Sequence, residues 1–338
     1  MAHEIPVIDI SEFLAGGSGD AAALEIEKAA TEIGFFQVVG HGVPTALLDG
    51  VYDAMHALTA LDEDTKLRYK SPSGHPYRGV HVRKDDTGAI RQERFLATRY
   101  ENPQAAIDAG VDPALADFFD PNCWPEGVAG FREACQALFV ATQQLAGRIM
   151  RLFALALGLG VDGFDDCIEP NSSSFAINHY PARNGPLDGG PPLLFAEHFD
   201  GNTLTILHQR GDYEGLQVLR LDAPDQYIAV PVREDAFVIN FGELMTHWTN
   251  DHWPATRHRV VAPTDPSHER TTLTTFHMPS LSTVVAPLEP WIGEDGPHYE
   301  PVTAYQWERQ RIKTSYGQKR TDGLSTDAAV VEYASTID

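Results

Sequence analysis

The sequence predicts an α+β protein in which helices come first and a β-rich core follows. Residues 125–158 carry the longest helical pattern, with apolar side chains at steps of three and four. After residue 174, short apolar runs alternate with turn residues seven times, which is typical of a β-sandwich or barrel. The chain has 338 residues and shows neither an internal repeat nor a low-complexity linker. We therefore expect one compact unit with a large buried core.

The N-terminal part combines short strands with helices. Residues 5–10 alternate in polarity and residues 35–39 form a continuous apolar run, so both stretches are predicted to be strands. Helical periodicity predicts helices over residues 21–33 and 45–61. The stretch 71–86 is rich in glycine, proline and charge, and we expect it to form a loop over a cleft.

The C-terminal half contains the predicted β core. Its strands are expected at residues 175–180, 203–208, 216–219, 227–230, 236–241, 258–262 and 271–277. A helix is predicted around residues 303–314. The residues from 316 onward are expected to be a frayed polar end, with closure over the site as the alternative.

The net charge of the chain limits the classes of partner that it is expected to bind. Lys and Arg number 25 against 48 Asp and Glu, which gives a formal net charge of −23. Such a surface repels phosphate backbones and anionic lipid, so we expect a small-molecule partner, no nucleic acid and no membrane. Three cysteines are too few for a disulfide framework or a thiolate metal site. The start lacks the pattern of a secretory signal, and the longest apolar run is too short to span a bilayer, so a cytoplasmic protein is expected.

A single H-x-D sequence, His198-Phe199-Asp200, suggests a metal site. Positions i and i+2 of a strand point the same way, so an imidazole and a carboxylate could meet at one ion. Two histidines and one carboxylate on one face leave coordination positions open, as in non-haem Fe(II) oxygenases. The alternative is a surface histidine beside a solvated aspartate.

A third ligand would come from a distant strand, and seven downstream histidines are candidates: His208, His247, His252, His258, His268, His277 and His298. His258 stands out because it begins an apolar strand. His247 and His252 lie in a stretch that resembles a loop, so packing or rim positions are expected for them. His298 shares a metal-like spacing with Glu300, but no histidine follows it in the chain.

Arg270 and Thr272 would lie on one face of another predicted strand. A buried arginine is costly unless a carboxylate pairs with it, and residues 271–277 contain no acidic side chain. A dicarboxylate ligand would satisfy this need. The alternative is an internal arginine–aspartate pair.

These motifs together resemble a known family. In chain order they are Asn178-His179-Tyr180-Pro181, His198-Phe199-Asp200, Gln209 with Gly215-Leu216-Gln217-Val218, Val238-Ile239-Asn240-Phe241-Gly242-Glu243, Thr249-Asn250, His258-Arg259-Val260 and Arg270-Thr271-Thr272. Their order is similar to that in the isopenicillin N synthase-like family of Fe(II)/2-oxoglutarate-dependent dioxygenases. In the N-terminal half, Gly34-Phe35-Phe36, Gly40-His41-Gly42-Val43-Pro44 and Pro121-Asn122-Cys123-Trp124-Pro125 add to the resemblance.

The resemblance implies a double-stranded β-helix (jelly-roll) core with an N-terminal helical extension and flanking helices. It divides the chain into a helix-rich extension, 1–120, a catalytic jelly-roll region with its long helix, 121–317, and a polar tail, 318–338. The first two parts are expected to form one compact unit.

The resemblance also implies the site residues. His198, Asp200 and His258 would be the iron ligands. The cosubstrate 2-oxoglutarate would be bound by Arg270, Thr272, Tyr180 and Asn178. Thr272 replaces the serine that is usual in the family but keeps a hydroxyl. The presence of Asp200 disfavours a halogenase. Candidates for lining the substrate pocket are Arg78, Arg94, Phe95 and Phe276.

The implied reaction couples decarboxylation of 2-oxoglutarate, to succinate and CO₂, to hydroxylation, desaturation or cyclisation of a small natural product or amino-acid derivative. Fe(II), 2-oxoglutarate and O₂ would be required, with ascorbate as a stimulant, and secondary metabolism such as antibiotic biosynthesis is the expected setting. Two alternatives stay open: an isopenicillin N synthase-like oxidase that does not use 2-oxoglutarate, and a cupin-like binding protein without catalysis.

Overall fold

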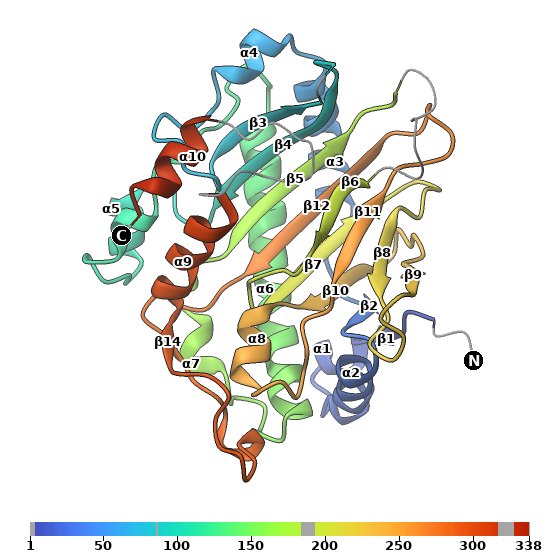
Figure 1. Cartoon of the computed structure of the whole chain (residues 1–338), viewed down its shortest axis with the longest axis vertical. Coiled ribbons are helices and arrows are strands. Elements are labelled where there is room, and N and C mark those ends of the chain that lie inside the picture. Colours follow the sequence, from blue (N-terminus) through green and yellow to red (C-terminus); the bar gives the residue numbers. More distant parts are fainter. Residues whose placement is uncertain (1–3, 86, 184–192, 317–327, 338) are drawn as a thin grey trace.

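The computed structural model describes residues 4–85, 87–183, 193–316 and 328–337, and it confirms the predicted α+β class (Figure 1). In this part of the chain, eight strands form a large sheet in the order β1-β2-β10-β7-β12-β5-β4-β3. The strands are β1 (Val7–Asp9), β2 (Phe35–Val39), β3 (Gly79–Lys84), β4 (Ile90–Thr98), β5 (Ser174–Tyr180), β7 (Leu204–Gln209), β10 (Phe237–Phe241) and β12 (Arg270–His277). The strands from the N-terminal region occupy both edges, so this region is built into the same sheet as the β core.

A second sheet covers one face of the large sheet. Its order is β6-β11-β8-β9, with β6 (Leu193–His198), β8 (Leu216–Leu219), β9 (Tyr227–Ala229) and β11 (His258–Val261). Apolar residues from both sheets, including Phe35, Val238, Leu216 and Val260, are buried together between them. Two mainly antiparallel layers packed over a shared interior are the sandwich that the strand pattern predicts.

Helices cover the other face of the large sheet. The longest, α6 (Phe131–Ala156), runs behind the sheet in Figure 1 and packs against α2 (Asp20–Glu32), α3 (Thr45–Thr59) and β12. It buries Leu138, Leu145, Ile149 and Leu152, which lie on one stripe of an α-helix. Phe153 of this helix meets Phe241 of β10, with ring centroids 4.9 Å apart. This apolar contact packs the helix against the sheet.

Shorter elements complete the described chain. They are α1 (Ser11–Leu14), α4 (Glu63–Leu67), α5 (Pro103–Asp108), α7 (Asp165–Ile168), α8 (Glu243–Trp248), α9 (Ala304–Tyr316), α10 (Ala328–Ser335), the strand pair β13 (Val284–Val285) and β14 (Val302–Thr303), and two 3₁₀ turns at Ala116–Phe118 and Glu289–Trp291. None of the helices in the described ranges has the length and apolarity needed to cross a membrane.

All seven strands predicted in the C-terminal half are present, with ends that differ by a residue or two. The expected loop at 71–86 is wrong over Gly79–Lys84, because β3 pairs there with β4. The backbone of Gly79 has φ +74°, and a Cβ atom at that position would lie 2.1 Å from the carbonyl oxygen of Tyr69. The glycine and proline residues just before β3 outweighed the alternation of Val80-His81-Val82-Arg83 in the sequence pattern, so this strand was missed.

The expectation of a frayed C-terminal end is also wrong for the residues that the structure describes. Helix α10 buries Ala334, and Ile337 beyond it lies in the same apolar cluster as Phe118 and Ile312. The ring of Tyr333 lies 4.8 Å from the ring of His75. Residues 317–327, which join the two C-terminal helices, lie outside the described residues. In the sequence, the polar residues before α10 made the short apolar stretch at the C-terminal end hard to recognise. Packing of this stretch offsets the conformational entropy that is lost when it becomes ordered.

Candidate functional site

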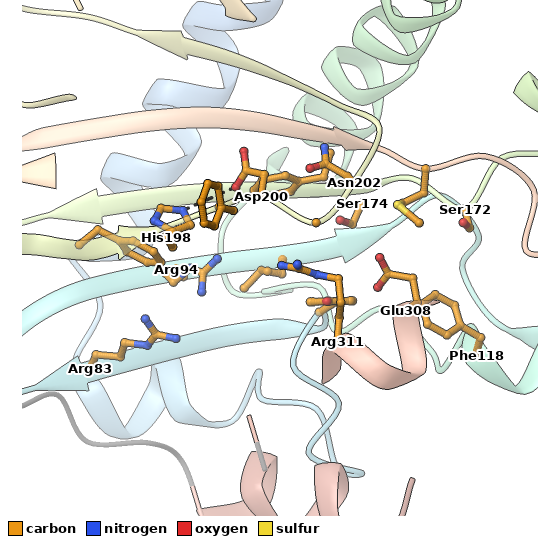
Figure 2. Close-up of a pocket in the computed structure, with 17 residues that line it drawn as sticks. Arg83, Arg94, Phe118, Ser172, Ser174, His198, Asp200, Asn202, Glu308 and Arg311 are labelled. Atoms are coloured by element: carbon orange, nitrogen blue, oxygen red, sulfur yellow. Dashed lines mark ion pairs between the residues drawn. The ribbon is translucent and has the colours of Figure 1, made fainter. Parts of the chain in front are cut away.

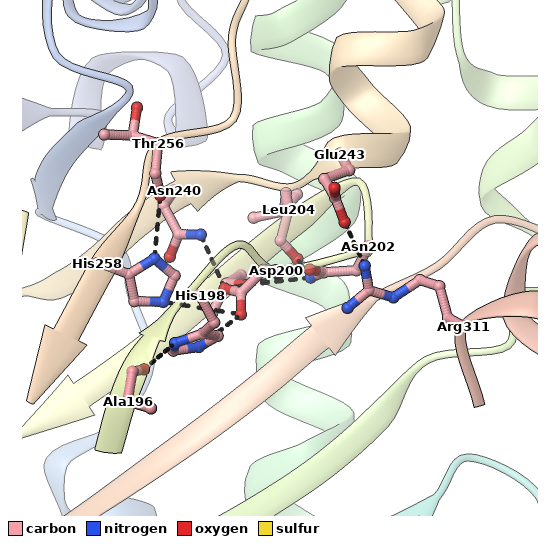
Figure 3. Close-up of polar contacts among 11 residues, drawn as sticks. Ala196, His198, Asp200, Asn202, Leu204, Asn240, Glu243, Thr256, His258 and Arg311 are labelled. Atoms are coloured by element: carbon pink, nitrogen blue, oxygen red, sulfur yellow. Dashed lines mark hydrogen bonds and ion pairs between the residues drawn. The ribbon is translucent and has the colours of Figure 1, made fainter. Parts of the chain in front are cut away.

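The H-x-D motif and His258 meet at one end of the smaller sheet. Strand β6 ends at His198, and β11 begins at His258, which lies directly opposite His198 in the antiparallel register. Nε2 of His198 is 3.6 Å from Oδ1 of Asp200, and Nε2 of His258 is 3.7 Å from the same oxygen. Figure 3 shows the three side chains directed toward one another.

The expected reason for this convergence is only partly right. Asp200 does not lie on the strand with His198, because β6 ends two residues before it. The carbonyl oxygen of Asp200 accepts a hydrogen bond of 2.8 Å from the backbone N–H of Glu243 at the start of α8. A turn anchored on this helix, rather than the period of a strand, carries the carboxylate back toward the histidine.

Backbone carbonyls orient both imidazole rings. Nδ1 of His198 is 2.9 Å from the carbonyl oxygen of Ala196, and Nδ1 of His258 is 3.1 Å from that of Thr256. A carbonyl oxygen can only accept, so each Nδ1 carries the proton and each Nε2 has a free lone pair. This tautomer is the one in which Nε2 binds a metal, with the other nitrogen held by an outer partner.

Two neighbouring side chains orient the carboxylate. Oδ2 of Asp200 accepts from the Thr205 hydroxyl at 2.6 Å and from the Asn240 amide at 2.8 Å. These bonds leave Oδ1 directed at the histidines. Burial opposes the ionised form, but His258, His198 and these hydrogen bonds outweigh it and hold the pKa of Asp200 below its usual range.

The protonation states suit metal binding. Burial and the nearby His198 lower the pKa of His258 to about 4, so this imidazole is neutral at neutral pH. With the ionised Asp200, the group offers two neutral nitrogen donors and one anionic oxygen donor. The three ligand atoms lie within 4.8 Å of one another, and this is the one such group of His, Cys, Asp and Glu among the described residues. Imidazole and carboxylate ligands on one side of an ion fit non-haem Fe(II).

The other histidine candidates have different partners. His208 contacts the Tyr52 hydroxyl at 2.9 Å, and His277 contacts the Thr203 hydroxyl at 2.8 Å. His247 lies 3.0 Å from the carbonyl oxygen of Glu300, and its ring stacks on Tyr299. The remaining three are near acidic side chains: His252 with Glu27, His268 with Asp212, and His298 with Asp251.

An inner cavity between the two sheets connects the triad with the predicted cosubstrate residues. It is lined by Phe35, Arg94, Asn178, Tyr180, Phe195, His198, Asp200, Thr205, Leu207, Leu216, Val238, Asn240, His258, Val260, Arg270, Thr272, Thr274 and Phe276. In the pairing of β12 with β5, Arg270 lies opposite Tyr180 and Thr272 opposite Asn178. These four residues therefore face one cavity together with the histidines and the aspartate.

Arg270 is a buried cation whose hydrogen bonds are incomplete. Its residue is 4% exposed, and its Nη2 donates to Oε1 of Gln209 at 3.1 Å. In the part of the chain that the structure describes, its Nε is buried without a partner, and no carboxylate forms an ion pair with it. The internal arginine–aspartate pair left open by the sequence is thus not found there. Since a buried charge without a counterion is costly, this guanidinium fits an anionic ligand.

Tyr180 and Asn178 are held by a hydrogen-bond network from β4. Gln92 donates to the Tyr180 hydroxyl oxygen at 2.9 Å, and Arg94 Nε donates to the Asn178 side-chain oxygen at 2.7 Å. Burial raises the pKa of Tyr180, so its phenol stays protonated and can donate to a ligand. Gln92 was not singled out in the sequence, because no motif marks it.

An outer cavity adjoins the inner one (Figure 2) and shares Arg94, Phe195, His198, Asp200 and Phe276 with it. Its other lining residues are Tyr77, Arg83, Leu96, Phe118, Ser172, Ser174, Phe199, Gly201, Asn202, Met278, Glu308 and Arg311. Of the predicted pocket residues, Arg94 and Phe276 thus lie at the boundary between the two cavities.

Arg78 and Phe95 do not line either cavity, which corrects their expected place. Arg78 is fully buried and donates to the carbonyl oxygens of Asp120 and Phe118 at 2.8 and 3.1 Å, so it holds a loop. Phe95 follows Arg94 on β4 and points to the opposite face, as successive strand residues do. Its ring lies 4.8 Å from Phe131 in the helix-side core.

Glu308 and Arg311 were missed in the sequence, although a signal exists. Ala304, Glu308 and Ile312 are all buried and recur every four residues on α9. This spacing places them on one helical stripe, and a carboxylate in the middle of a buried stripe is unusual. Arg311 reaches the cavity one turn later and pairs with Glu243.

Comparisons with known proteins indicate the same family as the sequence motifs. Residues 5–127 match the family described as non-haem dioxygenase in morphine synthesis N-terminal, and residues 171–279 match the 2OG-Fe(II) oxygenase superfamily. The chain is 30% identical to isopenicillin N synthase of Streptomyces jumonjinensis over 320 residues, covering 89% of this chain and 92% of that protein. It is 28% identical to the 2-oxoglutarate-dependent dioxygenase citB of Monascus ruber over 329 residues, covering 93% and 96%.

A solved structure shows the same fold. A full-length Neurospora crassa protein in complex with alpha-KG and thymine superposes with a TM-score of 0.80 at 23% identity, covering 92% of this chain and 97% of that one. The resemblance recognised in the sequence is confirmed by these matches. The chain belongs to the 2OG-Fe(II) oxygenase superfamily and is an Fe(II)/2-oxoglutarate-dependent dioxygenase.

Proposed function

We propose that this dioxygenase holds Fe(II) with His198, Asp200 and His258, binds 2-oxoglutarate at Arg270, and oxidises a C–H bond of a small molecule in the outer cavity. One observation carries the proposal: the triad and the incompletely bonded Arg270 line the same buried inner cavity. A metal site alone would not require the arginine, and an arginine alone would not require the triad.

The iron ligands act through their fixed orientation. Nε2 of both histidines and Oδ1 of Asp200 would occupy one side of the ion and leave the cavity side open for ligands. When bound, Fe(II) supplies the oxidative chemistry, in which 2-oxoglutarate and O₂ are consumed, succinate and CO₂ are released, and the substrate is oxidised.

The wall formed by β12 and β5 would position the cosubstrate. The guanidinium of Arg270 would bind the distal carboxylate, using the Nε–H that has no partner among the described residues. Thr272 and the protonated Tyr180 add hydroxyl donors from the same wall. Asn178, fixed by Arg94, lies nearer the middle of the strand pair and would contact the other end of the molecule.

The outer cavity would hold the substrate beside the iron ligands. Phe195 lies with its ring 4.6 Å from that of His198, and it lines both cavities with Phe276. These aromatic walls would exclude water from the reacting carbon and limit the positions that it can take.

The proposal also extends to the substrate class and the biological setting. We propose a small natural product or amino-acid derivative as the substrate, in secondary metabolism such as antibiotic biosynthesis. Support comes from the relatives, which include isopenicillin N synthases of two Streptomyces species and fungal 2-oxoglutarate-dependent dioxygenases. The net charge of −23 supports the absence of nucleic-acid and membrane partners. A cytoplasmic location is proposed on the sequence alone.

An anaerobic titration tests the proposal. Fe(II) and then 2-oxoglutarate are added to the protein, and the visible charge-transfer band of the chelate is followed. We expect the band in the wild type and its loss in His258→Ala. An enzyme that binds Fe(II) but gives no band with 2-oxoglutarate would contradict the assigned cosubstrate site.

Measurement of the reaction products tests the oxidase alternative. The comparisons favour a 2-oxoglutarate-dependent dioxygenase, and the relatives also include isopenicillin N synthase. Succinate released in step with substrate oxidation supports the proposal. Full-rate product formation without 2-oxoglutarate would support the oxidase instead.

A further inference from the structure

We propose that Glu308 recognises the substrate by binding a protonated amine, and that the substrate is an amino acid or a similar small zwitterion whose anionic group lies at Arg94. This inference rests on the proposed function, because it takes the outer cavity as the substrate site.

Glu308 is a buried carboxylate, and one of its two oxygens accepts no hydrogen bond from the described residues. It is 6% exposed, lines the outer cavity, and its Oε2 has no hydrogen-bond partner among the described residues. The Tyr77 hydroxyl donates the hydrogen bond that the carboxylate does have. Figure 2 shows the carboxylate group among the side chains around this cavity. A buried carboxylate oxygen without a donor is unfavourable, and a bound ammonium would supply the donor and the opposite charge.

Arg311 only partly offsets the charge of Glu308, through a longer-range electrostatic interaction. Arg311 follows one turn later on α9, but its Nη1 donates to Glu243, the residue with which it forms its ion pair. No ion pair joins Arg311 to Glu308 in the described ranges. Arg311 is thus bonded to another carboxylate, and Oε2 of Glu308 is left to accept a hydrogen bond from a ligand.

Arg94 provides the opposite charge at the other end of the cavity. Its Nε donates to Asn178, and within the described part of the chain no carboxylate forms an ion pair with it. It lines both cavities together with His198, whereas Glu308 lines only the outer one. Figure 2 shows Arg94 near His198 and Glu308 beyond Arg311. A ligand spanning these positions meets Arg94 near the iron site, passes Arg311 with its Glu243 partner, and reaches the carboxylate of Glu308 at the helix.

Apolar side chains form part of the wall between these charges. Leu96, Phe118, Phe276 and Met278 line the outer cavity. Such walls favour a carbon skeleton between the two charged groups. A purely anionic substrate would place no donor at Glu308, and a purely cationic one would face Arg94. A zwitterion with an apolar body satisfies both ends.

The test uses the full-length enzyme loaded with Fe(II) and 2-oxoglutarate without oxygen. The probes are the proteinogenic L-amino acids, together with the N-acetyl and the amide derivative of each. Binding is measured by the change that a probe causes in the charge-transfer band, and coupling by succinate release in air. We expect at least one amino acid to bind, and its N-acetyl derivative to bind about 30-fold more weakly, since a charged hydrogen bond is lost.

Variants assign this preference to Glu308. Glu308→Gln should lose most of the discrimination against the N-acetyl derivative and leave the dissociation constant of 2-oxoglutarate unchanged, while Glu308→Asp should restore part of it. Glu294→Gln, at an exposed position, is the matched control and should behave as the wild type. Thermal unfolding checks that each variant is folded.

Three outcomes would overturn the inference. One is binding of neutral or purely anionic derivatives in preference to every amino acid. Another is an unchanged preference in Glu308→Gln. The third is the absence of any response to the amino acids in an enzyme that shows the 2-oxoglutarate band. Absence of that band before any probe is added would instead contradict the proposed function, and this inference with it.

Discussion

His258 lies directly opposite His198 across the β6–β11 pair, and the centroids of the two imidazole rings are 4.2 Å apart. The chain between them forms strands β7, β8, β9 and β10 before it returns to this register. Strand pairing, not proximity in sequence, therefore determines the distance between the two proposed nitrogen ligands.

Replacing His258 should abolish iron binding. In His258→Ala only one nitrogen and one carboxylate remain at the centre, and we expect activity to fall by about 10³-fold or more. Iron content after anaerobic loading is the measurement. His268→Ala, which removes a partly exposed histidine, is the control and should keep its iron. Equal iron content in the two variants would show that the metal lies elsewhere.

Removing the Thr205 hydroxyl should weaken iron binding without abolishing it. This hydroxyl donates to Oδ2 of Asp200 and orients the carboxylate, so Thr205→Val should lower iron affinity by about 10-fold or more. Competition with a chelator measures the affinity. Thr275→Val is the matched control, because its hydroxyl contacts Thr142 of α6 at 2.7 Å and not the site. A loss of affinity in the control alone would contradict the assigned role.

Changes at Arg270 should act on 2-oxoglutarate and not on iron. Arg270→Gln removes the buried charge, and we expect the dissociation constant of 2-oxoglutarate to rise by about 100-fold. Arg270→Lys keeps a charge but loses the planar fork, so a smaller rise is expected. The charge-transfer titration reports both. Arg259→Lys, at a residue that stacks over Tyr227 away from the cavities, should titrate like the wild type.

The ionisation of Glu308 should reduce the stability of the ligand-free protein. Burial raises the pKa of Glu308, with Arg311 and the Tyr77 hydrogen bond opposing this. Above the raised pKa the folded protein holds a charge that the unfolded chain solvates better. As the pH falls through that pKa, the carboxyl takes up a proton and this penalty disappears.

Glu308→Gln should therefore raise the free energy of unfolding by about 1 kcal/mol at neutral pH, and the gain should shrink toward acid pH. Thermal unfolding of the ligand-free protein across a pH series is the measurement, with a rise in Tm of about 1–3 °C expected at neutral pH. Glu294→Gln should show no such gain. A gain that does not depend on pH would mean that the buried group is not ionised.

Local patterns of apolar residues predicted most of the β core and the long helix. The seven strands of the C-terminal half were found close to their predicted ends, although some, such as β10, are buried on both faces. Helix α6 begins at Phe131, later than the predicted start at residue 125. Strand β3 was missed because glycine and proline residues precede it, and strand β4 because charged and apolar side chains are mixed on both of its faces. Strand β6 was also missed, and its residues Leu193–Ala196 are all apolar and show no alternation.

The side chains on β4 show that residue types alone do not decide to which face of a sheet a side chain points. Arg94 and Phe95 were both expected at the substrate pocket, but only Arg94 faces it, because neighbouring strand residues point to opposite faces. Arg78 was expected there as well, but it forms hydrogen bonds to carbonyl groups away from the cavities. The register of a strand decides such questions, and register depends on pairing with distant strands.

The amino-acid sequence by itself determined the α+β class, the set of residue types for a metal and a dicarboxylate, and their order along the chain. Those features follow from local periodicity and from motifs, which need no knowledge of distant contacts. Only the tertiary structure decided that Asp200 reaches the histidines through a turn anchored on α8, that Arg270 lacks a carboxylate partner in the described residues, and that Glu308 faces the cavity. Each of these depends on which distant segments pack together, and packing is a property of the whole fold.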